Sequence, residues 1–128
     1  MRIFNIKPFI RFAKSEGITD AQLFDAVVEI EKGLFEADLG GGLLKKRVAR
    51  IGGGKSGGYR TLVAYREGKR AFFLHGFAKN DKENISDSEL TYLKKSAKIY
   101  LALSEGEIES ALKEKELKEV PYGKKKKI

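Results

Sequence analysis

The spacing of apolar residues predicts the first elements of the chain. Residues 2–6 form a short extended segment, and the apolar residues that follow lie on one side of a helix. Proline fits the first position of a helix, because its missing N–H would have no intrahelical partner there. We therefore predict a strand over residues 2–6 and a short helix that starts at Pro8 and ends before Gly17.

Three later helices are predicted from capping boxes. In each box a Ser or Thr is followed three residues later by Gln or Glu, and apolar residues flank the pair. The two side chains can then satisfy backbone N–H groups that otherwise lack partners at the start of a helix. The first predicted helix starts after Thr19 and runs to about Gly33. The second starts after Ser86 and covers residues 87–103, and the third starts after Ser104 and covers residues 105–115.

The middle of the chain has an extended pattern. Three segments rich in β-branched and aromatic residues lie at 43–51, 59–67 and 70–79. The last two are separated by Glu-Gly-Lys, a turn of hairpin length. The three segments predict an antiparallel meander, and with the flanking helices they indicate an α+β fold.

Length and composition favour one domain. With 128 residues and 41% hydrophobic content the chain can build its own core, which we place in residues 1–120, followed by a basic, disordered tail over residues 121–128. The absence of cysteine and the single histidine argue against disulfides, thiolate catalysis and a metal site, so we expect no cofactor. No apolar run approaches the roughly 18 residues of a membrane span. Residues 1–17 also lack a signal-peptide pattern, so we expect a cytoplasmic protein without a membrane partner.

Positive charge is concentrated in the predicted sheet. Residues 39–80 contain ten Lys and Arg but one acidic residue, a net charge of +9. The whole chain carries +8, so the rest of it sums to −1. A surface this cationic favours a polyanion such as a nucleic acid.

The segment Gly54-Lys55-Ser56 matches the end of a phosphate-binding P-loop, but we reject that interpretation. Ala49 stands where the first glycine of the pattern belongs, and a strand rather than a helix is predicted to follow. A P-loop lysine needs the N-terminus of a helix behind it to hold phosphate. We interpret residues 52–58 as a basic loop between two strands, with Lys55 exposed on it.

The basic strand over residues 42–50, the strand start over residues 58–63 and the strand end over residues 77–81 resemble the RelE/HigB branch of the RelE/ParE toxin superfamily. The resemblance implies a small α+β fold in which two N-terminal helices pack on one face of an antiparallel sheet, with C-terminal helices, leaving the other face concave and basic. It also implies the toxin of a bacterial type II toxin–antitoxin system. Such toxins usually cut messenger RNA in the translating ribosome and are neutralised by a cognate antitoxin, so the implied partners are antitoxin, ribosome and mRNA.

Cations can carry out much of the chemistry of metal-independent RNA cleavage. The reaction requires removal of a proton from a 2′-hydroxyl, stabilisation of extra negative charge on phosphorus and protonation of the departing 5′-oxygen. Alternate residues of a strand share a face, so Lys45 and Arg47 project together and Arg60 can join them. Lys79 has the same parity as His75 and completes the cluster if that side is exposed.

These residues can be given provisional roles. The planar guanidinium of Arg60 suits phosphate binding, Arg47 suits charge stabilisation, and a lysine crowded by cations, such as Lys45, is a candidate general base. By resemblance, the positions of Lys45, Arg47 and Arg60 match basic residues that many RelE-like toxins use for catalysis. His75 either transfers a proton near neutral pH or packs within the sheet.

The chain departs from the better-known members of the family at two positions. Where those members have an arginine after the third strand, this chain has Lys79 followed by Asn80. Where they have a tyrosine on the last helix, it has Ser86. The identities of the general acid and base therefore stay open.

The remaining candidates concern RNA contact and have structural alternatives. Lys46 and Arg50 are either phosphate contacts or solvated edge charges, and Tyr59 either stacks on a base or belongs to the core. The terminal lysines either strengthen binding to ribosomal RNA or only increase solubility. The candidate RNA-binding residues are Lys46, Arg50, Lys55, Tyr59, Asn80, Lys124, Lys125, Lys126 and Lys127.

Three functions are compatible with these features. The leading hypothesis is a ribosome-dependent, metal-independent mRNA endoribonuclease. A ParE-like toxin that inhibits DNA gyrase shares the fold but needs no cluster for phosphate cleavage. A non-catalytic RNA-binding domain would bind RNA with a steep salt dependence and leave it intact.

Overall fold

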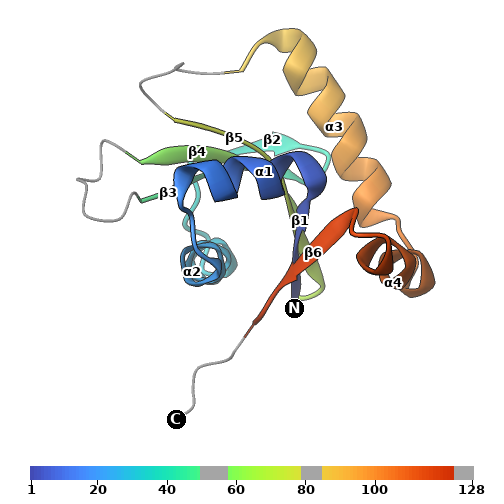
Figure 1. Ribbon diagram of the computed structural model, residues 1–128. Coiled ribbons are helices and arrows are strands. Elements are labelled where there is room, and N and C mark those ends of the chain that lie inside the picture. Colours follow the sequence, from blue (N-terminus) through green and yellow to red (C-terminus); the bar gives the residue numbers. More distant parts are fainter. Residues whose placement is uncertain (50–57, 79–84, 123–128) are drawn as a thin grey trace.

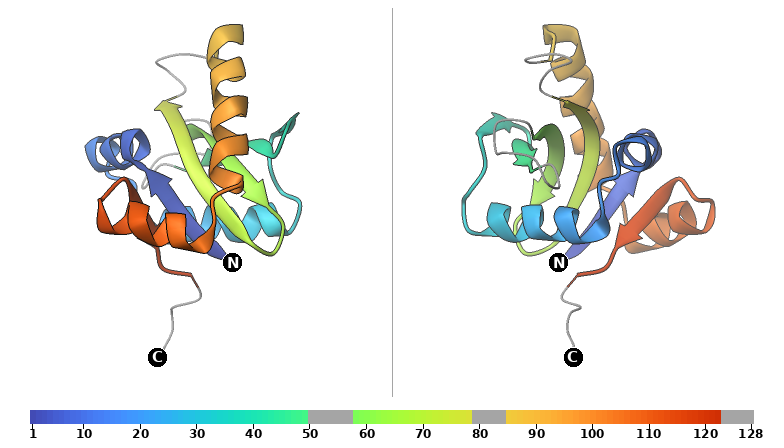
Figure 2. Two further views of the ribbon diagram at one scale, coloured as in Figure 1. Left: turned by 90° about the vertical axis from the view of Figure 1, so that its right-hand side faces the viewer. Right: turned by 60° about the vertical axis from the view of Figure 1, so that its left-hand side comes forward.

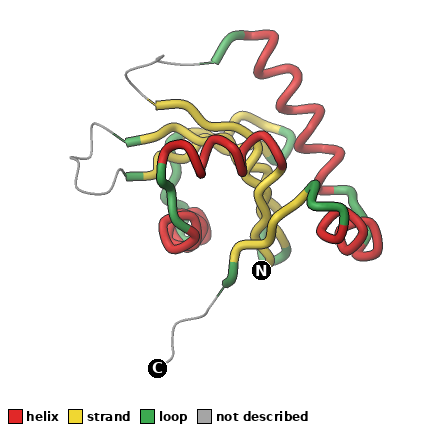
Figure 3. Tube along the Cα trace, in the orientation of Figure 1, coloured by secondary structure: helices red, strands yellow, loops and turns green. Residues whose placement is uncertain are grey.

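The computed structural model describes residues 1–49, 58–78 and 85–122, which form an α+β fold with a six-stranded sheet between helices (Figure 1, Figure 3). None of the described helices is long and apolar enough to cross a membrane. The elements in chain order are β1 (Arg2–Ile6), α1 (Lys7–Glu16), α2 (Asp20–Glu31), β2 (Ala37–Gly40), β3 (Leu43–Val48), β4 (Tyr59–Arg66), β5 (Arg70–Ala78), α3 (Asp87–Leu101), α4 (Glu105–Lys113) and β6 (Leu117–Val120).

The strands lie in the order β2-β3-β4-β5-β1-β6. The predicted meander is confirmed, because β3, β4 and β5 pair antiparallel in sequence. The sequence pattern did not predict that β1 pairs parallel to β5 and antiparallel to β6. Nor did it predict β2 and β6, since each has only four residues and is too short to show a clear periodicity.

All three predicted capping boxes are confirmed. The hydroxyls of Thr19, Ser86 and Ser104 accept the N–H of the third helical residue at 3.2, 3.2 and 3.1 Å. The Gln or Glu at that third position accepts the N–H of the capping residue at 2.8, 2.9 and 2.8 Å. Each cap stabilises its helix by about 1 kcal/mol, so these local signals fix where α2, α3 and α4 begin.

The helices cover the two faces of the sheet unequally. Helices α1 and α2 pack on one face, as the family resemblance implied. On the opposite face, helix α3 crosses β4 and β5 (Figure 2). Its apolar stripe of Leu93, Ala97 and Leu101 is buried. The open part of this face is therefore bounded by α3.

Aromatic packing holds α1 against the sheet. Phe9 stacks on Phe73 of β5 with ring centroids 5.2 Å apart, and Phe12 meets the edge of Tyr59 at 5.8 Å. The ring of Phe12 also lies directly over Gly76, where an added Cβ would be 2.5 Å from Phe12 Cε2. Glycine in the middle of β5 thus permits the close approach of α1.

Gly76→Ala is expected to lower the free energy of unfolding by about 1–3 kcal/mol, because the new methyl group displaces Phe12 from a packed interface. Gly106→Ala is the control, since Gly106 lies in the first turn of α4 with its nearest neighbour 3.9 Å from an added Cβ. Urea denaturation of both variants measures the difference. Equal stability of Gly76→Ala and wild type would contradict this account of the α1 contact.

Arg2 attaches the C-terminal elements to the sheet. Its Nε and Nη2 atoms donate to the two carboxylate oxygens of Glu119 on β6 at 2.9 and 2.8 Å. Its Nη1 atom donates to Glu105 and Glu109 of α4, both at 3.0 Å. The hydrogen bonds from Arg2 lower the pKa of Glu119. Arg2 therefore joins β1, β6 and α4 through three carboxylates.

Glu119→Gln should reduce stability at neutral pH by up to about 1 kcal/mol, the range of partly exposed ion pairs. Because the pKa of Glu119 is lower in the folded state, its contribution is full above its unfolded pKa of about 4.3 and is lost as pH falls through the folded value. Denaturation between pH 7 and pH 3 should show wild type and variant converging at the acidic end. A difference in the free energy of unfolding that stays constant with pH would exclude this linkage. The control is Glu114→Gln, because Glu114 is exposed at the end of α4.

Candidate nucleic-acid interface

The register of β3 and β4 brings the predicted cationic residues onto one face. Arg47 lies directly opposite Arg60, and Lys45 lies opposite Leu62. Directly opposed residues project to the same side, with Cβ atoms about 4.5–5.5 Å apart. Lys45, Arg47 and Arg60, here called the cationic cluster, are all half-buried. The predicted grouping by strand parity is therefore confirmed, on the sheet face opposite α1 and α2.

A β-bulge places His75 on the same face. Leu62 pairs with His75 while the next residue, Val63, pairs with Phe73, so Leu74 has no partner on β4. The extra residue reverses the alternation. Phe73 consequently faces α1, and His75 faces the cationic cluster with its ring centroid 6.0 Å from that of Phe77. The position is compatible with either interpretation of this histidine.

Arg60 has an unsatisfied donor at the centre of the interface. Its Nη1 atom is buried and has no hydrogen-bond partner among the residues that the structure describes. Leaving such a group unpaired costs about 1–3 kcal/mol or more, and buried groups of this kind often mark functional sites. A phosphate oxygen is a suitable acceptor for a guanidinium N–H. The cluster is thus arranged to accept an anion between β3 and β4.

Glu36 brings a carboxylate to the edge of the cationic cluster, and sequence reasoning missed it. Its Oε1 atom accepts the backbone N–H of Arg47 at 2.5 Å, and its own N–H donates to Lys45 O at 2.9 Å. No element was predicted at this position, so the sequence had no signal that would place the residue. Pairing of β2 with β3 brings it there.

Two predicted RNA contacts lie on the wrong face. Lys46 Nζ bonds to Glu29 Oε1 at 2.6 Å and to Leu34 O at 3.0 Å, and only 6% of its side chain is exposed. Tyr59 is buried in the α1 contact, and its hydroxyl donates to Glu16 O at 3.2 Å. Phosphate contact by Lys46 and base stacking by Tyr59 require exposed side chains. The prediction of RNA contact is therefore corrected for both residues: Tyr59 belongs to the core, the alternative already considered for it, and Lys46 is neither a phosphate contact nor a solvated edge charge, because it is buried and paired beneath α1 and α2.

Rejection of the P-loop interpretation is confirmed, because the next described element after Gly54-Lys55-Ser56 is strand β4 and not a helix. At the other end of the chain, Tyr122 donates to Glu31 Oε1 at 2.7 Å, so contacts with the folded domain extend two residues into the predicted tail.

The remaining candidate site residues lie outside the described residues; they are Arg50, Lys55, Lys79, Asn80, Lys124, Lys125, Lys126 and Lys127.

A cavity of about 330 Å³ adjoins the cationic cluster, between the sheet and the start of α3. Leu62, Phe77 and Leu90 contribute apolar wall, and Lys45 and Asp87 contribute charged groups. Sequence reasoning missed Asp87, because the residue was interpreted only as the beginning of a helix. The cavity forms where residues distant in sequence meet, so no local pattern indicates it.

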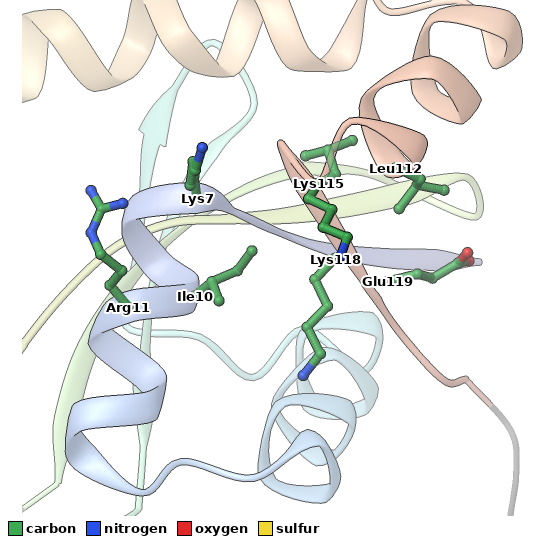
Figure 4. Close-up of a pocket in the computed structure, with 8 residues that line it drawn as sticks. Lys7, Ile10, Arg11, Leu112, Lys115, Lys118 and Glu119 are labelled. Atoms are coloured by element: carbon green, nitrogen blue, oxygen red, sulfur yellow. The ribbon is translucent and has the colours of Figure 1, made fainter.

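A larger groove of about 640 Å³ lies between α1, the end of α4 and β6 (Figure 4). Ile10 points into it from α1, and Arg11 of the same helix is also among its lining residues (Figure 4). Its lining comes from elements other than β3 and β4, so it is separate from the cationic cluster. The apolar lining residues are Ile10, Leu112 and Leu117, and the surrounding cations are Lys7, Arg11, Lys115 and Lys118.

In the part of the chain that the structure describes, no group of three or more His, Cys, Asp or Glu residues could hold a metal ion.

Two comparisons with known proteins bear on the identity of the chain. A search of curated proteins found no match. The family model described as the RelE toxin of the RelE/RelB toxin–antitoxin system matches residues 1–120, from before β1 to the end of β6. With the match extending over all the described elements, the chain belongs to the RelE toxin family.

Proposed function

We propose that this toxin is a ribosome-dependent mRNA endoribonuclease of the RelE/HigB type that acts without a metal ion. Membership of the family makes it the toxin of a toxin–antitoxin system with an antitoxin partner. The observation that carries the catalytic proposal is the buried Nη1 donor of Arg60, which has no hydrogen-bond partner among the described residues and belongs to the residue that pairs with Arg47. Action on the ribosome would place the protein in the cytoplasm.

The cationic cluster supplies the charge that RNA cleavage needs. Arg60 would bind the non-bridging oxygens of the scissile phosphate, and Arg47 would stabilise the additional negative charge of the transition state. The 2′-oxygen attacks phosphorus and loses its proton, the bond from phosphorus to the 5′-oxygen breaks, and that oxygen gains a proton. The products are a 2′,3′-cyclic phosphate and a 5′-hydroxyl.

Three basic residues are candidates for the proton transfers. Lys45 lies on the same face as Arg47 and Arg60 and is the first candidate for the general base. His75 is the second candidate, since its imidazole ordinarily titrates near neutral pH and its position lies opposite Leu62. Lys79, which follows Ala78 at the end of β5 in the sequence, is the third candidate for proton transfer. Rate profiles against pH for single variants would distinguish them.

Arg60→Ala should abolish RNA cleavage, with a loss of at least about 100-fold, because one preorganised charge donor is removed from the transition state. The protein is induced briefly in bacterial cells and new 5′ ends of mRNA are mapped. Wild type and the control Arg66→Ala, exposed at the end of the same strand, should produce cuts inside translated reading frames. Thermal unfolding confirms that both variants fold.

Two outcomes would overturn the catalytic proposal. Growth arrest with intact messages would indicate a ParE-like action on gyrase. Wild-type protein that neither arrests growth nor cuts RNA would indicate a non-catalytic RNA-binding domain.

The antitoxin is expected to neutralise the toxin by covering the cationic cluster, since an acidic segment would satisfy its charges. Arg47→Glu with Arg60→Glu should therefore weaken binding of the antitoxin encoded beside this gene by at least about tenfold in calorimetry. Lys113→Glu, exposed on α4, should bind normally. Normal binding by the double variant, with loss on Arg11→Glu, would instead place the antitoxin at the groove of Figure 4.

A further inference from the structure

The cavity beside the cationic cluster has the dimensions and composition of a small ligand site. Its volume of about 330 Å³ lies in the range of such sites, which are mostly apolar and carry a few polar groups that fix orientation. Leu62, Phe77 and Leu90 give it apolar walls from β4, β5 and α3. A flat aromatic ring would bury its faces against these side chains.

The cavity is continuous with the proposed phosphate-binding residues. Lys45 belongs to both, because it lines the cavity and is part of the cationic cluster. Phe77 lies directly opposite Arg60 in the pairing of β4 with β5. A nucleotide whose phosphate contacts Arg60 therefore has its base within reach of the cavity.

Asp87 limits which base the cavity can accept. It lines the cavity from the first residue of α3, and its side chain is exposed, so the carboxylate is accessible to a ligand. An ionised carboxylate only accepts hydrogen bonds, so it needs a base edge with donors. Proteins that recognise single-stranded RNA commonly bind the Watson–Crick edges of unstacked bases.

Guanine is the base whose Watson–Crick edge presents two adjacent donors, N1–H and the N2 amino group. Adenine and cytosine present one donor beside an acceptor nitrogen, and uracil presents one donor between two carbonyl oxygens. Each of these three would bring an acceptor close to the Asp87 carboxylate. The ammonium of Lys45 complements guanine further, because O6 is an acceptor.

We propose that this cavity binds a guanine base of the RNA substrate and that Asp87 is the residue that selects it. The inference deepens the proposed function, on which it rests for the identity of the substrate. Asp87 accepts hydrogen bonds from N1–H and the N2 amino group, while the apolar walls cover the ring. Its position in the first turn of α3 also stabilises the helix slightly, a role that does not depend on the base.

Binding of nucleoside 5′-monophosphates tests the cavity without requiring cleavage. Each of GMP, AMP, CMP and UMP carries the same phosphate, so differences in affinity report on the base. Inosine monophosphate is the matched ligand, since it keeps N1–H and O6 but lacks the N2 amino group. NMR titration of the full chain should show GMP shifting the amide signals of Leu62, Phe77 and Leu90, with at least about tenfold tighter binding than AMP or inosine monophosphate.

Asp87→Asn should weaken GMP binding at least about tenfold and remove most of the preference over AMP. Asp25→Asn is the matched control, because Asp25 is an exposed carboxylate on α2, across the sheet. A preference for GMP that survives in Asp87→Asn would overturn the proposal. So would equal affinity for all bases, signal shifts confined to other surfaces, or no binding of GMP.

Cleavage mapping separates this inference from the proposed function. Wild-type cuts should cluster beside guanines, and Asp87→Asn should spread them to other bases. Cuts without a guanine bias, or an unchanged bias in Asp87→Asn, would exclude the guanine site and leave the endoribonuclease intact. If no cuts occur, the endoribonuclease proposal fails, and the nucleotide titration still decides whether the cavity binds guanine.

Discussion

The β-bulge at Leu74 is the constraint on which the candidate interface depends. Before it, Phe73 packs on Phe9 of α1; after it, His75 and Phe77 turn toward the opposite face. In a regular strand Phe73 and His75 would share a face. Such a strand would either bury the histidine beneath α1 or remove a phenylalanine from the core. One additional residue lets a single strand serve both layers.

The basic side chains on the two faces of the sheet differ in their hydrogen-bond partners. On the face covered by α1 and α2, Lys46 is buried and paired with Glu29. On the other face, Arg60 keeps a buried donor without a partner among the described residues. The first arrangement stabilises the fold, and the second leaves a position that an anion can fill. Helix α3 shelters part of this second face and creates the cavity next to the cluster. The proposed phosphate and base contacts therefore adjoin one another.

The sequence by itself determined the features that depend on neighbouring residues. Capping boxes placed the starts of three helices correctly, because their hydrogen bonds join residues three positions apart. Alternation placed Lys45 and Arg47 on one face, since successive side chains of a strand project to opposite sides. The concentration of charge in residues 39–80 indicated a surface for a polyanion. The family resemblance supplied the arrangement of α1 and α2 on the sheet.

Tertiary structure decided everything that depends on partners distant in the chain. Whether Lys46 and Tyr59 were exposed depended on which face α1 and α2 would cover. The place of β1 between β5 and β6 depended on pairing that joins the two ends of the chain. Asp87 became a candidate site residue only when α3 packed over β4 and β5. Strand parity divides side chains into two sets, but only packing determines which set meets solvent.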